Sequence, residues 1–125
     1  MSITTNQPAT TVQMPLMTAT GNIAIEMLLL PVLSPASVAA NTTVEQMFSV
    51  PGLLPGDFVE VNKPALQAGL GIVNTRSGLN VLYIGFANNT AAPILPNVSE
   101  SYQVCISRPY AISLANGLPT SLPTP

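Results

Sequence analysis

The chain has 125 residues, of which only three are Lys or Arg and five are Asp or Glu; there is no histidine and the formal net charge is −2. Hydrophobic residues make up 47 % of the chain, whereas an ordinary soluble domain is about one quarter charged. This composition argues against intrinsic disorder, which needs low hydrophobicity and high net charge. The three cations, Lys63, Arg76 and Arg108, lie far apart, so binding to nucleic acid or to an anionic membrane is not expected.

The first segment, residues 1–20, is rich in Thr, Asn, Gln and Pro and is predicted to form an extended arm. Pro8 and Pro15 would break a helix there. The segment has no positive charge followed by an apolar run, so we expect no secretion signal and synthesis in a cytoplasm. The apolar stretch from Met27 to Leu33 is interrupted by Pro31 and falls short of the ~20 residues of a membrane-spanning helix.

Residues 21–108 are predicted to form the folded body, and its pattern favours β-strands. Thirteen prolines and eight glycines oppose long helices. Strands are expected at residues 23–30, 44–50, 57–62, 70–75, 80–87 and 101–107. The segment 80–87 alternates but is apolar on both faces, so it is predicted to be a central strand. The segment 23–30 fits either a strand or a short helix that ends before Pro31.

The connections between these strands have the composition of turns. Pro51-Gly52 and Pro55-Gly56 bracket a tight loop before Asp57, and Arg76-Ser77-Gly78 predicts a short hairpin between two strands. Residues 88–97 are predicted to form a longer loop. Short strands spaced by about 10–20 residues favour an all-β fold, a small antiparallel β-sandwich of the immunoglobulin-like or jelly-roll-like kind, or a small barrel. Residues 109–125, which are rich in proline, are expected to form an extended C-terminal tail.

No catalytic, cofactor-binding or metal site is predicted. Without histidine the chain cannot form a Ser–His or Cys–His pair. Asp57 and Glu60 are the only carboxylates close in sequence, and three residues apart on a strand they point to opposite faces. We expect the carboxylates to be solvated surface charges, and Asp57 also to bind backbone amides in its turn.

The remaining polar candidates are a cysteine and two arginines. Cys105 is the only cysteine, so the chain has no internal disulfide, and we expect an inert, partly buried thiol. Arg76 and Arg108 leave two interpretations open: a solvated charge, or a partner for a carboxylate on a neighbouring subunit. Tyr83 and Tyr102 are expected to pack in the core or in an interface.

Several short motifs between residues 48 and 108 occur together in an order that resembles a known class of protein. They read Phe-Ser-Val-Pro-Gly-Leu at 48–53, Gly-Asp-Phe-Val at 56–59, Asn-Lys-Pro at 62–64, Gln-Ala-Gly-Leu-Gly-Ile-Val-Asn at 67–74 and Phe-Ala-Asn-Asn-Thr-Ala-Ala-Pro at 86–93. This half of the chain resembles small virion structural proteins of tailed bacteriophages, some of which decorate the capsid. The resemblance implies a β-rich domain bound as a trimer to the outside of an icosahedral head. Residues 1–47 carry no such resemblance.

Charge scarcity and the resemblance lead to one functional expectation. A chain of this length cannot bury all its apolar surface, so we expect other subunits to cover part of it. The expected function is that of a non-enzymatic capsid decoration, or cement, protein on the capsid exterior of a virion, with itself and the major capsid protein as partners. The alternatives are a tail-fibre or receptor-binding module that uses the loop 88–97, and a small β-barrel carrier of an apolar ligand.

Overall fold

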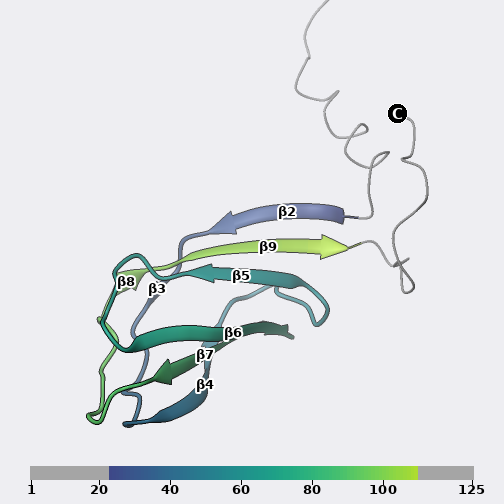
Figure 1. The fold of residues 1–125 in the computed structure, drawn as a ribbon. Coiled ribbons are helices and arrows are strands. Elements are labelled where there is room, and N and C mark those ends of the chain that lie inside the picture. The colour runs from purple at the N-terminus through teal and green to yellow at the C-terminus, as the bar shows by residue number, and fades with distance from the viewer. Residues whose placement is uncertain (1–22, 110–125) are drawn as a thin grey trace, which may run out of the picture. The chain divides into compact units, whose positions relative to one another are not determined.

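The computed structural model describes residues 23–109, and every regular element within that range is a β-strand (Figure 1). The strands are β2 (Ile23–Leu29), β3 (Val32–Leu33), β4 (Thr42–Ser49), β5 (Phe58–Asn62), β6 (Leu70–Gly78), β7 (Val81–Asn88), β8 (Glu100–Ser101) and β9 (Gln103–Pro109). They form sheets in the orders β2-β9-β5, β4-β7-β6 and β3-β8. The predicted all-β fold with antiparallel sheets packed against each other is confirmed, and residues 25–108 form one compact unit. The arm predicted at 1–20 and residues 110–125 of the predicted tail lie outside the described range.

The strand β7 is the centre of its sheet, as its apolar pattern predicted. It pairs antiparallel with β4 on one side and β6 on the other. Its side chains Leu82, Ile84 and Phe86 are fully buried. They share one core with Val104 and Ile106 of β9 and with Tyr102, which directly precedes β9. The prediction that the tyrosines pack in the core or in an interface is confirmed for Tyr102, which lies in the core with no exposed surface, whereas Tyr83 is half-buried.

The hairpin between β6 and β7 lies later than the sequence predicted. Residues 76–78 belong to β6, in which Gly78 pairs with Val81, and the turn consists of Leu79 and Asn80. The predicted hairpin between two strands is confirmed, but its predicted turn at Arg76-Ser77-Gly78 is wrong. The reason is Asn80, whose φ of 60° is a left-handed conformation that asparagine tolerates. Its side-chain oxygen also accepts a hydrogen bond from the amide of Gly52.

Side-chain hydroxyls join β6 to β5, the neighbouring edge of the other sheet. Thr75 Oγ1 donates to the carbonyl of Val59 at 3.0 Å and Ser77 Oγ donates to the carbonyl of Asp57 at 2.8 Å. These bonds satisfy carbonyls in β5 and just before it that would otherwise be open to another strand. The sandwich is therefore closed along this side.

The segment 23–30, for which a short helix was an alternative, is the strand β2, and it is the end strand of its sheet. The strand ends at Leu29, shortly before Pro31, which has no amide hydrogen to donate. One face of β2, with Ile25, Met27 and Leu29, lies over the buried residues of the β4–β5 connection. The strands β3 and β8, two residues each, were not predicted.

Candidate functional site

All eight charged residues of the chain lie within the described range, and most of them form ion pairs with one another. Arg76 on β6 donates through Nε and Nη2 to the two carboxylate oxygens of Glu45 on β4, each at 2.8 Å. Its guanidinium lies 3.7 Å from the ring centroid of Tyr83 on β7, in a cation–π contact. The pair therefore spans the central strand, and the Arg76 hydrogen bonds lower the pKa of Glu45.

The second ion pair fixes the connection between β4 and β5. Arg108 donates to Asp57 Oδ1 at 2.9 Å and Oδ2 at 2.7 Å, and also to the carbonyl of Gly52 at 2.8 Å. Asp57 Oδ2 accepts a further bond from the amide of Leu54, which confirms its predicted role in the turn. Asp57 is only 7 % exposed, and the Arg108 guanidinium holds its pKa below the ordinary value.

The third ion pair lies at the opposite end of β5. Lys63 Nζ is 2.9 Å from Glu100 Oε1, with both side chains only 11 % exposed, and it also donates to the carbonyl of Ala65 at 2.7 Å. Burial raises the pKa of Glu100, but hydrogen bonds from Lys63 and Asn97 outweigh that effect and the net shift is downward. The same carboxylate and burial raise the pKa of the Tyr102 hydroxyl to about 12, burial being the larger cause.

These pairs correct the predictions made for the charged residues. Arg76 and Arg108 each pair with a carboxylate of the same chain; the Arg108 side chain is 31 % exposed, whereas that of Arg76 is 53 % exposed and remains solvated. The expectation of solvated carboxylates is wrong for Asp57 and Glu100, whose side chains are 2 % and 11 % exposed, whereas Glu45 is an exposed residue that pairs with Arg76 at the surface. It holds for Glu26 and Glu60, which are exposed, form no ion pair within residues 23–109 and account for the net charge of −2.

The described part of the chain brings few reactive side chains together. Asp57 and Glu60 do not face each other across a cleft, since Asp57 is buried against Arg108 and Glu60 is exposed. Cys105 is half-buried, as predicted, and lies opposite Glu60 in the β5–β9 register. No group of three His, Cys, Asp or Glu residues that could hold a metal ion occurs within residues 23–109.

The loop 88–97, the recognition element of one alternative function, is held by its own hydrogen bonds. Asn88 is 1 % exposed and donates through Nδ2 to the carbonyls of Val38 and Ala92. Its Oδ1 accepts bonds from the amide and hydroxyl of Thr90. Sequence reasoning missed this buried asparagine, although the polar run Asn88-Asn89-Thr90 after a buried strand was a usable signal.

The motif at 67–74 has a structural role at the same end of the sandwich. The side chain of Gln67 donates to the carbonyl of Leu95 and accepts from the amide of Asn97, so it joins two loops. Gly69 has a φ of +84° and its carbonyl accepts a bond from the amide of Asn89. The motif therefore positions loops and brings no reactive group to the surface.

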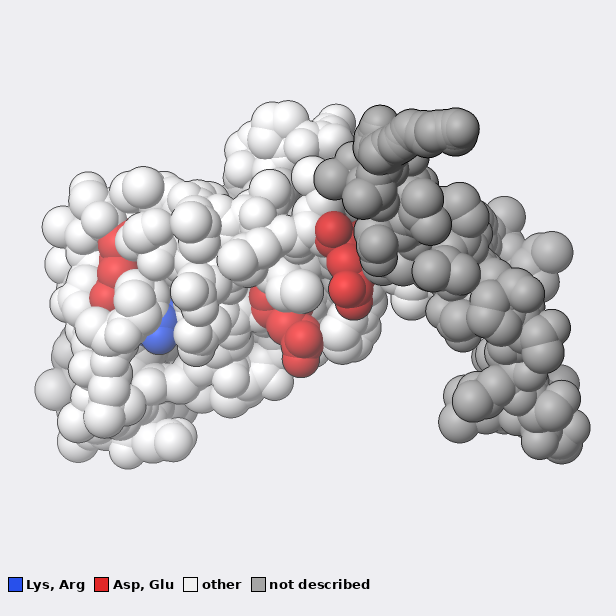
Figure 2. Space-filling view, turned by 90° about the horizontal axis from the view of Figure 1, so that it is seen from above, with Lys and Arg blue, Asp and Glu red and all other residues white. Residues whose placement is uncertain are grey.

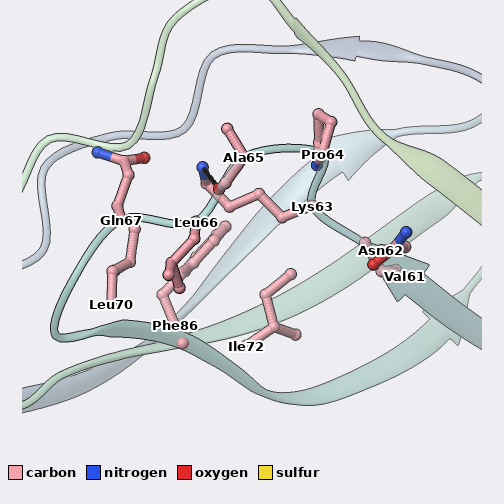
Figure 3. Close-up of a pocket in the computed structure, with 11 residues that line it drawn as sticks. Val61, Asn62, Lys63, Pro64, Ala65, Leu66, Gln67, Leu70, Ile72 and Phe86 are labelled. Carbon is pink, nitrogen blue, oxygen red and sulfur yellow. Dashed lines mark hydrogen bonds between the residues drawn. The ribbon is translucent and has the colours of Figure 1, made fainter.

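A surface hollow of about 420 Å³ lies beside this end (Figure 3). Its walls come from the end of β5 and the loop that follows, and Ile72 and Phe86 contribute apolar surface. The polar groups around it are already engaged: Lys63 bonds to Ala65 and Glu100, as Figure 3 shows for Ala65, and Gln67 bonds to the neighbouring loop. The hollow therefore presents no free charge to a ligand.

Apolar side chains are exposed over much of the described surface. The large hydrophobic residues with the most solvent exposure, each above one half, are Met27, Leu28, Leu30, Val32, Met47, Phe58, Leu66, Val73, Leu79, Leu95 and Val98. The face in Figure 2 is uncharged over most of its area, with acidic side chains in a few places and a small basic spot. This combination of exposed apolar residues and internally paired charge is the candidate functional feature.

Comparison with known proteins gives no precedent for this surface feature. No protein-family model, no curated protein and no solved structure matches the chain. Within residues 23–109 no helix is long and apolar enough to cross a membrane.

Proposed function

We propose that this chain is a non-enzymatic virion structural protein that binds the outer surface of a phage capsid and stabilises the head. In this proposal it is made in the host cytoplasm, forms a homotrimer and contacts the major capsid protein. The observation that carries the proposal is that all three cations are paired within the chain while many large apolar side chains stay exposed. The resemblance of residues 48–108 to phage virion proteins supports the same conclusion.

The mechanism would be energetic. Covering about 1,000 Å² of largely apolar surface, at about 25 cal/mol per Å², supplies on the order of 25 kcal/mol of gross stabilisation. Opposing it are about 4–15 kcal/mol or more for lost translational and rotational freedom, and further costs for ordering side chains and desolvating polar groups at the interface. Repeated over many equivalent sites, such contacts would reinforce a shell against internal pressure.

The alternative of a receptor-binding module receives less support from the structure. Its recognition loop would be 88–97, yet the Asn88 side chain and Thr90 hydroxyl are engaged inside that loop. A recognition loop needs polar groups that are free to bind the receptor or glycan. Binding of the purified protein to host cells, with no binding to capsids, would favour the alternative.

The test is co-sedimentation of the full-length protein with heads assembled from the major capsid protein of the same genome. An apolar contact predicts binding that is retained between about 0.1 M and about 1 M NaCl, because salt screens ion pairs but not apolar burial. Absence of binding at both salt concentrations contradicts the proposal. Loss of binding as salt rises would show that ion pairs form the contact, against the argument from internal pairing.

A further inference from the structure

Two carboxylates lie without a cation on the outer face of the sheet β2-β9-β5. Glu60 of β5 is opposite Cys105 of β9, and Glu26 of β2 accepts a hydrogen bond from Ser107 Oγ of β9 at 3.4 Å. Cys105 and Ser107 are alternate residues of one strand and Ile106 between them is in the core, so both glutamates lie on the outer face. Both are exposed and form no ion pair within residues 23–109. Figure 2 views the side on which β2 lies in Figure 1, and some acidic side chains visible there have no basic side chain beside them.

The same face contains a hollow of about 320 Å³ next to Glu60. Leu28 of β2 and Glu60 of β5 line it from the two outer strands, and Cys105 of the central strand lies between them. Asn62 and Gln103 also line it, and these two amides bond to each other at 3.0 Å. Glu60 is the only charged residue that lines the hollow, and Leu28, which is 61 % exposed, gives it an apolar wall.

This combination of an apolar wall and one carboxylate fits a lysine or arginine side chain. Such a side chain has an apolar stem, which would pack against Leu28, and a cationic end, which would reach the Glu60 carboxylate. An uncharged partner on the same face would instead remove water from Glu26 and Glu60 without replacing it by a cation, and that is unfavourable. The face therefore selects a cationic partner.

A second copy of this chain does not supply the required cation. Lys63, Arg76 and Arg108 are each paired with a carboxylate of their own chain. Arg76 lines a groove beside Glu60, yet its Nε and Nη2 both donate to Glu45. Moving any of these cations to another copy would leave its own carboxylate unpaired. The partner is therefore a different protein.

We propose that the outer face of the sheet β2-β9-β5 binds a different protein that presents one lysine or arginine side chain to the hollow beside Glu60 and a second cation to Glu26. Strands about 4.8 Å apart with a rise of about 3.4 Å per residue place the Cα atoms of the two glutamates about 12 Å apart, which sets the spacing of the partner's cations. Phe58, opposite Ser107 and 59 % exposed, adds apolar surface on the same face. This ionic contact goes beyond the proposed function, whose head contact is apolar.

The test uses the full chain and immobilised poly-L-lysine as the cationic probe, with binding measured by surface plasmon resonance at about 50 mM NaCl. The double variant Glu26→Gln/Glu60→Gln is expected to weaken binding about fourfold to twenty-five-fold, because one exposed ion pair contributes about twofold to fivefold and distant pairs add. At about 0.5 M NaCl, wild-type binding is expected to fall to the level of the double variant, since salt screens exposed ion pairs.

A charge-matched control separates this face from the net charge of the protein. Leu79→Lys/Leu95→Lys changes the formal net charge from −2 to 0, as the double glutamine variant does. These two leucines are 65 % and 57 % exposed and lie in the β6–β7 turn and the loop 88–97. Binding within about twofold of wild type is expected for this control, because charges farther away than a Debye length are screened. Circular dichroism and thermal melting check folding, and Glu60→Thr replaces Glu60→Gln if that variant is not folded.

Three outcomes overturn the proposal. They are wild-type binding by the double glutamine variant, an equal loss of binding by Leu79→Lys/Leu95→Lys, and no binding of the wild-type protein at low salt. Co-sedimentation with heads tests the proposed function separately. The double glutamine variant is expected to bind heads as the wild-type protein does, so failure of this inference leaves the proposed function untouched.

Discussion

The carboxylate of Asp57 is the most strongly bound charged group in the described structure. It accepts hydrogen bonds from two nitrogens of Arg108 and from the amide of Leu54, and its side chain is only 2 % exposed. A hydrogen bond to a charged group contributes about 1.5–3 kcal/mol. This single residue therefore joins the β4–β5 loop to the end of β9.

Replacing Asp57 by Asn is expected to lower the free energy of unfolding by about 2–3 kcal/mol near pH 7. Asn keeps an oxygen for the Leu54 amide but removes the charge that pairs with Arg108. The loss of stability stays below that expected for a fully buried ion pair, because the Arg108 side chain is 31 % exposed and water can solvate its charge once the carboxylate is removed. Urea titration measures it, and Glu26→Gln, which removes an exposed charge, serves as the control with little expected change.

The stabilisation by Asp57 depends on pH in a defined direction. Because its pKa is lower in the folded protein than the ordinary value of 3.8, the contribution is complete above pH 3.8 and is lost as pH falls through the folded pKa. The stability difference between wild type and Asp57→Asn should therefore shrink in strong acid. A difference that stays constant down to that range would show that the carboxylate is not paired as described.

Residue-level prediction from the sequence succeeded where the partners were local. The turn role of Asp57 follows from Leu54, three residues away. Its pairing with Arg108, 51 residues away, depends on β5 and β9 being neighbours, which no spacing in the sequence encodes. The same limit explains why Arg76 and Glu45, on strands flanking β7, were not recognised as a pair.

At the level of elements, Gly69 controls the close approach of two loops. Its φ of +84° lies in a region that other residues rarely adopt, and an added Cβ would overlap Cγ2 of Thr90. Gly69→Ala is expected to lower the free energy of unfolding by about 1–3 kcal/mol. Gly71→Ala is the matched control, because a Cβ there meets nothing within 4 Å, and its change should stay within about 0.5 kcal/mol. Equal changes in urea-unfolding midpoint would contradict this role for Gly69.

The strands themselves were predictable to the extent that they alternate. In β7 and β9 every second residue points into the core, and the predicted bounds of both strands lie within two residues of the observed ones. The end of β6 was missed because Asn80, not the glycine at 78, adopts the left-handed turn conformation. β3 and β8 are two residues long and exist because Val32 and Leu33 pair with Ser101 and Glu100, which leaves no local periodicity to detect.

For the molecule as a whole, scarcity of charge predicted exposed apolar surface but not how the few charges are used. Internal pairing uses six of the eight charged residues, since three ion pairs join three cations to three carboxylates. The described surface consequently presents few unpaired charges.

An apolar hollow under β2, lined on one side by Ile25, Met27 and Leu29, bears on the hypothesis of a carrier for an apolar ligand. Its volume of about 200 Å³ is below the roughly 300–1,000 Å³ of pockets that hold drug-sized ligands, and Val50, Leu53 and Ile106 beneath it are packed in the core. A medium-chain fatty acid is therefore expected to leave the melting temperature of the native protein unchanged. A specific ligand at about 100 times its Kd would add about 2.7 kcal/mol of stability, so a saturable rise in melting temperature would restore the carrier hypothesis.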